Sequence, residues 1–287
     1  MINYELYHFS YFCFMNLLKS VFSFYINSSI HVAIAVCALL GVTSLELDIE
    51  VSKSLFGFVF FGTITGYNFV KYVEIAGLRR QNLRLSLKTI RIFSFLCFGM
   101  LVFFALKLSF KTLLVISSFA VLTFLYEIPF LKNKTLRTFK GIKIFIVALV
   151  WAGVSVIIPL VDDSQSISVN NVITFIQRFF IVLVLTIPFE IRDLSYDSLE
   201  LGTLPQRIGV LTSKILGFII LGITLLLEFF KEDINQSHLL SLTVLIFIIT
   251  MFLLATNKKQ PKFFASFWIE SIPIVWVILL FYFKGII

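Results

Sequence analysis

Long apolar runs alternate with short polar segments along almost the whole chain. A helix that crosses the hydrocarbon core of a bilayer needs roughly 20 predominantly apolar residues, and these runs have that length. The pattern therefore predicts an all-α, polytopic membrane helical bundle of about nine transmembrane helices, in a single domain over residues 1–287. The predicted spans are 29–46, 54–72, 91–108, 111–129, 141–161, 171–190, 209–230, 238–256 and 264–284.

A further apolar stretch, residues 8–27, precedes the first predicted span and has polar groups on both flanks. This arrangement favours an interfacial helix that leads into the first span. A cleaved signal peptide is disfavoured, because the stretch has neither a basic segment before it nor an evident cleavage site with small residues.

Composition supports a lipid environment. The chain is 59% hydrophobic and 14% charged, and its mean hydropathy is +1.00. Soluble domains average roughly 45–50% apolar and about 25% charged residues. The 3 cysteines and 3 histidines are dispersed along the sequence, which predicts interface or packing roles and argues against a zinc site.

The net charge of +8 is distributed unevenly among the loops. Most basic residues fall in every second loop, whereas Glu46, Asp162, Glu228 and their acidic neighbours fall in the others. The positive-inside rule then predicts a cytoplasmic N-terminus and an external C-terminus in a plasma or inner membrane. In such a chain the positive charge reflects orientation in a lipid membrane, and it does not indicate binding to nucleic acid.

The segment FEIRDLSYDSLELGTLPQRIG, residues 189–209, carries the richest chemistry. Glu190, Asp193, Asp197 and Glu200 are spaced three, four and three residues apart, so a continued helix would place them on one face. Such a stripe suits Mg²⁺, which uses one or two protein carboxylates and is completed by substrate phosphates. The alternative is a solvated acidic helix end whose carboxylates pair with neighbouring arginines.

This segment resembles the second aspartate-rich motif of the UbiA superfamily of membrane prenyltransferases. The matching residues are Arg192, Asp193, Asp197, Gly202, Thr203, Leu204, Arg207 and Gly209. Segment 127–130 with the basic run 132–143 is similar to the family's basic loop after the fourth span. Segment 263–276 looks like its last span, with Glu270 where an aspartate is usual.

The first aspartate-rich motif of that family is degraded in this chain. Asn68 aligns with the family asparagine, but Phe69, Tyr72 and Ala76 stand where aspartates are expected. Lys71 suggests a compensation, in which an ammonium acts on phosphate where a metal ion stood. The alternative is a surface pair between Lys71 and Glu74, and Tyr72 would either contact substrate or lie at the membrane interface.

The resemblance implies a Mg²⁺-dependent transfer of a prenyl group from an isoprenoid diphosphate to an aromatic or other lipophilic acceptor. Asp193, Asp197 and Asn68 would be catalytic, and Asp193, Asp197 and Glu190 would hold Mg²⁺. The diphosphate-binding candidates are Lys71, Tyr72, Lys132, Lys140, Arg192 and Arg207. Two alternatives stay open: a catalytically inactive protein of this fold that binds or moves lipid or serves as a partner subunit, and an unrelated transporter.

Overall fold

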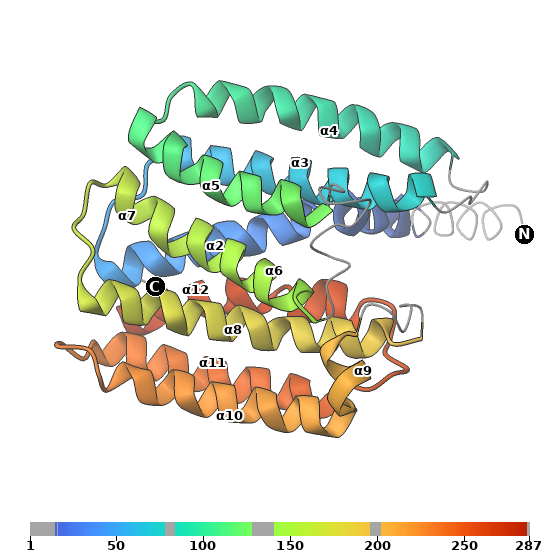
Figure 1. Ribbon diagram of the computed structural model, residues 1–287. Coiled ribbons are helices and arrows are strands. Elements are labelled where there is room, and N and C mark those ends of the chain that lie inside the picture. Colours follow the sequence, from blue (N-terminus) through green and yellow to red (C-terminus); the bar gives the residue numbers. More distant parts are fainter. Residues whose placement is uncertain (1–14, 16, 78–83, 128–140, 196–201, 286–287) are drawn as a thin grey trace, which may run out of the picture.

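A computed structural model describes residues 15, 17–77, 84–127, 141–195 and 202–285 of the chain, with the backbone alone described at 72–77, 84–87 and 126–127. All regular secondary structure in these residues is helical, which confirms the predicted all-α bundle. Each predicted span coincides with a helix or with consecutive helical segments (Figure 1). The helices are α2 (Ile30–Leu47), α3 (Lys53–Gly77), α4 (Arg84–Ala105), α5 (Phe110–Glu127), α6 (Lys143–Ala152), α7 (Ile158–Asp162), α8 (Val169–Asp193), α9 (Leu204–Ile208), α10 (Val210–Glu228), α11 (Gln236–Ala255) and α12 (Ile272–Phe283).

Helix length and apolarity make the chain an integral membrane protein. Within the described residues, 7 helical segments are long and apolar enough to cross a bilayer, so the expected count of about nine is approximate. The outer helices expose large apolar side chains, including Phe95 and Leu96 on α4 and Leu211 on α10. Lipid tails solvate such side chains, as water would not.

Helix α2 lies at the centre of the packing. It packs against α3, α12, α7 and the π-helical turn Gly153–Ile157 that joins α6 to α7. Its side chains at Leu39, Leu40 and Val42 are fully buried. Gly153 in this turn allows close packing against α5, because a Cβ at this position would lie 2.1 Å from the ring of Phe119.

Prolines are accommodated inside the apolar helices. Pro159 follows the π-helical turn at the start of α7, and Pro273 lies in the first turn of α12. Pro188 is inside α8, where Gln260 donates a hydrogen bond of 2.8 Å to its carbonyl oxygen. Such irregularities are tolerated in membrane helices when neighbouring groups satisfy the backbone.

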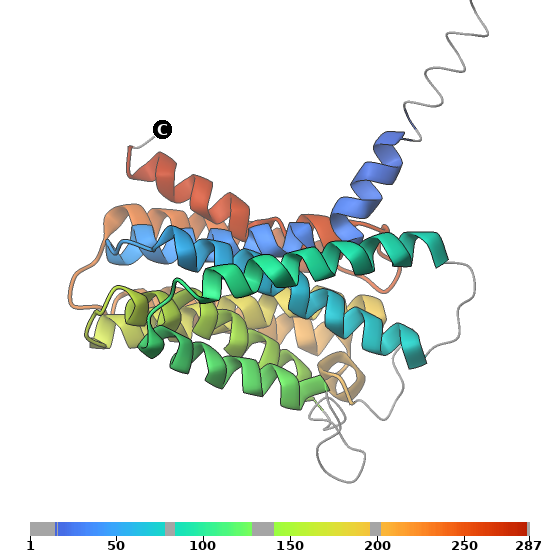
Figure 2. The same ribbon diagram turned by 90° about the horizontal axis from the view of Figure 1, so that it is seen from above.

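The N-terminal helix, residues 17–27 within the predicted interfacial stretch, projects from the bundle at an angle (Figure 2). Residues 8–14 of that stretch lie outside the described part. Phe22 packs edge-on against Phe263 and Phe267, which attaches this helix to the segment before α12.

The bundle has two ends, and we name each after one residue. At the Lys71 end, α3 and α8 finish and α2 and α6 begin. At the Glu46 end, α2 and α10 finish and α8 and α11 begin (Figure 1). The clusters of described charged side chains lie at these two ends.

Candidate functional site

Three charged side chains from separate elements come together at the Lys71 end. Lys71 belongs to α3, Arg192 to the last turn of α8, and Glu270 follows the π-helical segment Phe264–Ile269. Glu270 is half-buried and close enough to interact electrostatically with both cations. Among the described side chains, none forms an ion pair with Glu270 within 4 Å. This carboxylate therefore lies near two positive charges without neutralising either by direct contact.

The N-terminal helix contributes Tyr25 to the same end. Burial raises the pKa of the Tyr25 hydroxyl, and the negative charge of Glu270 raises it further. Tyr25 Oη lies 2.7 Å from Nδ1 of His31, whose Nε2 lies 3.0 Å from the carbonyl oxygen of Phe267. A carbonyl can only accept, so Nε2 carries the imidazole proton and the Tyr25 hydroxyl donates to Nδ1.

Asp193 is the described member of the predicted pair of motif aspartates. Its two carboxylate oxygens accept from Arg192 Nε at 2.8 Å and from a terminal guanidinium nitrogen at 3.1 Å. The guanidinium also lies over the ring of Phe189, 5.2 Å from its centre. Both side chains remain partly exposed, so ligand atoms can reach them. In the described part of the chain, no three or more His, Cys, Asp or Glu side chains form a metal-binding group.

Glu190 and Arg207 connect α8 to the short helix α9. Glu190 is buried, and its Oε2 accepts a hydrogen bond of 3.0 Å from the backbone N–H of Leu204, at the first turn of α9. Arg207 is exposed in the last turn of α9, with its guanidinium beside Gly141 just before α6. Glu190 thus satisfies an unpaired helix N–H, a structural contact that the carboxylate stripe alone does not reveal.

Asn68 is fully buried and joins three elements. Its Nδ2 donates to the carbonyl oxygen of Ser28 at 3.1 Å and to Ser94 Oγ at 2.9 Å, while its Oδ1 accepts from Ser29 Oγ at 2.9 Å. Lys71, one turn later, donates to Ser29 Oγ at 2.9 Å and to the carbonyl oxygen of Asn27 at 3.3 Å. The polar turn between the N-terminal helix and α2 is therefore held by α3.

The structure brings together part of the predicted site. Lys71, Arg192, Asp193 and Glu190 lie at one end of the bundle, near Asn68, while Arg207 follows on α9. Three other predicted residues, Asp197, Lys132 and Lys140, lie outside the described residues, as does the side chain of Tyr72. The roles assigned to all of these residues stay predictions.

A second cluster of charge lies at the Glu46 end, and the sequence interpretation missed it. Glu46 accepts from Thr174 at 2.7 Å, from Lys231 at 2.8 Å and from Arg178 at 3.3 Å. His238 Nε2 lies 3.3 Å from the same carboxylate. These residues come from α2, α8, α11 and the turn after α10, so one carboxylate joins four parts of the chain.

Glu228 extends this cluster. It pairs with Lys231 at 2.8 Å and with Nδ1 of His238 at 2.9 Å, and it accepts from Gln177 at 2.9 Å. Burial lowers the pKa of Lys231, but the charges of Glu46 and Glu228 outweigh burial, and its pKa is raised overall. Lys231 is thus held in its charged form, between two carboxylates.

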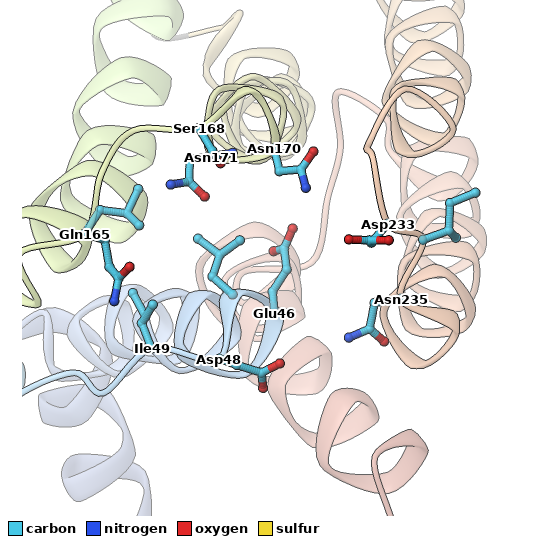
Figure 3. Close-up of a pocket in the computed structure, with 12 residues that line it drawn as sticks. Glu46, Asp48, Ile49, Gln165, Ser168, Asn170, Asn171, Asp233 and Asn235 are labelled. Atoms are coloured by element: carbon cyan, nitrogen blue, oxygen red, sulfur yellow. Dashed lines mark hydrogen bonds between the residues drawn. The ribbon is translucent and has the colours of Figure 1, made fainter.

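A polar pocket of about 430 Å³ opens above Glu46. Figure 3 shows Glu46, Asn170, Asn171, Asp233 and Asn235 around the opening, from the ends of α2 and α8 and the loop before α11. Some of these side chains cap helices, since Asn235 accepts from the N–H of His238 at 3.2 Å. The sequence signal was present, because charged residues near the ends of several apolar spans meet at this one end.

No protein-family model matches the sequence, and no curated protein matches it. Solved structures do match the fold. A UbiA homolog from Archaeoglobus fulgidus bound to Cd²⁺ has a TM-score of 0.61 at 13% identity, over 90% of this chain and 99% of that chain. A UbiA homolog from Archaeoglobus fulgidus bound to GPP and Mg²⁺ has a TM-score of 0.57 at 12% identity, over 90% of this chain and 99% of that chain. A digeranylgeranylglyceryl phosphate synthase has a TM-score of 0.55 at 16% identity, over 91% and 97%. The chain therefore has the fold of UbiA homologues.

Proposed function

We propose that the protein is a Mg²⁺-dependent membrane prenyltransferase. It transfers a prenyl group from an isoprenoid diphosphate to a lipophilic acceptor, at the Lys71 end of the bundle. The main support is that Lys71, Arg192 and Asp193 lie together at one end of the bundle. One solved structure with a similar fold is bound to GPP and Mg²⁺. The positive-inside pattern of the loops favours the cytoplasmic face for this end.

Asp193 and the nearby cations would form, together with Asp197 of the same motif, a site that a metal ion and a phosphate complete. Mg²⁺ is usually held by one or two carboxylates and by substrate phosphates, so Asp193, with Asp197 of the same motif, supplies a sufficient donor set. Arg192 now occupies both oxygens of Asp193. Its guanidinium has the fork geometry that binds phosphate, so a bound diphosphate would draw it away and free the carboxylate. The bound metal would supply positive charge to the diphosphate oxygens.

The transfer needs charge stabilisation more than covalent chemistry. The bond between the first prenyl carbon and the diphosphate oxygen breaks, and its electron pair leaves with the diphosphate. A nucleophilic atom of the acceptor forms the new bond to that carbon, and its proton passes to the released diphosphate or to water. Lys71 and Arg192 offset the negative charge that gathers on the leaving diphosphate. Apolar and aromatic side chains of the bundle exclude water from the prenyl cation.

A catalytically inactive protein of this fold, acting in lipid binding or transport or as a partner subunit, is the second candidate. The replaced aspartates at Phe69, Tyr72 and Ala76 favour it. The internal hydrogen bonds of Asn68 favour it too, because they commit the remaining motif residue to packing. Under this reading, the charges at the Lys71 end bind a phosphorylated lipid without breaking its C–O bond.

Turnover separates the two candidates. Purified protein in lipid nanodiscs is incubated with Mg²⁺, labelled prenyl diphosphates of several chain lengths and a membrane lipid extract as acceptor source. The enzyme reading expects Mg²⁺-dependent release of diphosphate and a labelled lipophilic product. Binding without release would favour the inactive protein, and neither binding nor release would defeat both readings.

A further inference from the structure

We propose that Ser29 and Asn68 are positioning residues that fix the ammonium of Lys71 for diphosphate binding. The proposal rests on the function proposed above, because Lys71 is the cation that would receive the diphosphate. Ser29 lies in the turn between the N-terminal helix and α2, and Asn68 is one helical turn before Lys71 on α3. In this proposal Asn68 acts by positioning Lys71 and does not itself contact the substrate.

The hydrogen-bond directions at Asn68 follow from its partners. Ser94 Oγ donates to the carbonyl oxygen of Ile90 at 2.8 Å, which can only accept. Ser94 Oγ therefore accepts from the Asn68 amide nitrogen, and the carbonyl oxygen of Ser28 takes the second amide proton. Both contacts fix the amide orientation, so Oδ1 faces Ser29.

Ser29 extends this chain of directed hydrogen bonds to Lys71. Its hydroxyl has one proton, which it donates to Asn68 Oδ1 at 2.9 Å. The Ser29 oxygen can then only accept from the ammonium, whose Nζ lies 2.9 Å away. Each bond of such a chain polarises the next, and here the chain ends at the Ser29 oxygen, which presents a lone pair to the ammonium.

Toward the described residues, one N–H of the ammonium has no acceptor and remains for a ligand. A lysine ammonium has three donors, and Lys71 uses one on Ser29 Oγ and one on the carbonyl oxygen of Asn27. Within the described residues it forms no ion pair with Glu270, although the two charges interact. A lysine held in this way gives up less rotamer freedom when it binds phosphate than a free lysine does.

The backbone of Ser29 supports this reading. Its φ of 65° and ψ of 18° lie in the left-handed region, where residues other than glycine are uncommon. Such conformations persist where surrounding contacts fix them. Glycine would adopt this turn more easily, but it has no hydroxyl to link Asn68 to Lys71.

The test is equilibrium binding of inorganic pyrophosphate with Mg²⁺ to the full chain in nanodiscs, measured by titration calorimetry. Ser29→Ala should weaken binding roughly tenfold, the usual size of a lost hydrogen bond to a charged group. Ser29→Gly removes the same hydroxyl but suits the left-handed turn, so it should give the same loss with no folding defect. Ser28→Ala is the matched control, since this adjacent buried hydroxyl has no hydrogen-bond partner in the described structure.

A double-mutant cycle distinguishes positioning from a general structural effect. If Ser29 acts through Lys71, Ser29→Gly should cause no further loss of affinity in a Lys71→Met background. Equal losses in both backgrounds would overturn the proposal. Wild-type protein that fails to bind pyrophosphate overturns the proposed function together with this inference. Binding that depends on Lys71 but not on Ser29 overturns the positioning role alone.

Discussion

The two ends of the bundle treat buried charge in opposite ways. At the Glu46 end, the carboxylate of Glu46 meets Lys231 at 2.8 Å and Arg178 at 3.3 Å, and Glu228 meets the same lysine at 2.8 Å. At the Lys71 end, Glu270 lies near Lys71 and Arg192 without a direct ion pair among the described side chains. One end has paired its charges internally, whereas the other keeps them close but incompletely paired.

We interpret this difference in terms of function: the Glu46 end stabilises the fold, and the Lys71 end binds ligand. A buried network of ion pairs fixes the arrangement of the helices that carry it, and breaking one member leaves an uncompensated charge. An incompletely paired, partly exposed cluster gains more when a ligand of matching charge arrives. We therefore expect substitutions at the Glu46 end to change stability, and substitutions at the Lys71 end to change diphosphate binding and turnover.

The largest expected effect is the loss of the Glu46 network. Glu46→Gln should lower the free energy of unfolding by about 3–5 kcal/mol, because Arg178 and Lys231 remain buried with too little negative charge. Reversible unfolding in mixed detergent measures it. Asp48→Asn is the control at the same end, since Asp48 is largely exposed in its pair with Lys284, and it should cost less than about 1 kcal/mol. An equal loss of unfolding free energy in the two variants would contradict a stabilising role for the Glu46 network.

The next largest effect concerns Asp193 and catalysis. Asp193→Asn should slow Mg²⁺-dependent diphosphate release at least roughly 100-fold, as expected when a group that stabilises transition-state charge is lost. Asp163→Asn, at the Glu46 end, is the matched control and should leave the rate unchanged. If Asp193→Asn kept full cellular function, the catalytically inactive reading would gain and the enzyme reading would fail.

Substitution of Lys71 should have a smaller effect, mainly on diphosphate binding. Lys71→Met should weaken Mg²⁺-pyrophosphate binding roughly 10- to 100-fold, the range for a charged hydrogen bond to phosphate. The free energy of unfolding should fall by no more than about 1.5 kcal/mol, because the half-buried side chain loses its two hydrogen bonds to the turn before α2. Lys107→Met, an exposed lysine at the other end, should affect neither quantity. A large loss of stability in Lys71→Met would mean that Lys71 serves the fold.

The smallest effect has the opposite sign. Glu270→Gln removes a negative charge beside Lys71 and Arg192, so it should tighten pyrophosphate binding by roughly three- to fivefold at low salt. The gain should shrink as ionic strength rises, because salt screens partly exposed charges. Calorimetric titration at two salt concentrations measures both effects. Weaker binding by this variant would show that Glu270 assists the ligand instead of opposing it.

The fold was largely predictable, because hydropathy reports directly on which segments lie in lipid. The predicted span 171–190, for example, falls inside α8, and 264–284 corresponds to the π-helical segment Phe264–Ile269 with α12. Segments 78–83, 128–140 and 196–201 lie outside the described residues, so the basic loop and half of the aspartate motif stay predictions. The predicted orientation of the termini stays a prediction too.

The site was only partly predictable, because side-chain partners come from distant parts of the chain. The motif pattern identified Asn68 as a special position, but its partners Ser28, Ser29 and Ser94 lie on other elements and follow no spacing rule. Likewise, Glu46 and Arg178 are 132 residues apart in sequence and form one pair. A buried charge in an apolar span signals that a partner exists, but the fold decides which one.

Photoaffinity labelling tests most directly whether the Lys71 end is the diphosphate site. A photoreactive prenyl diphosphate analogue is bound to the protein in nanodiscs with Mg²⁺, irradiated, and the labelled peptides are identified by mass spectrometry. We expect labelling near Lys71 and Arg192 and in the segment 263–276, competed by inorganic pyrophosphate and strongly reduced in Lys71→Met. Labelling confined to the pocket above Glu46, or labelling that pyrophosphate does not compete, would contradict the account.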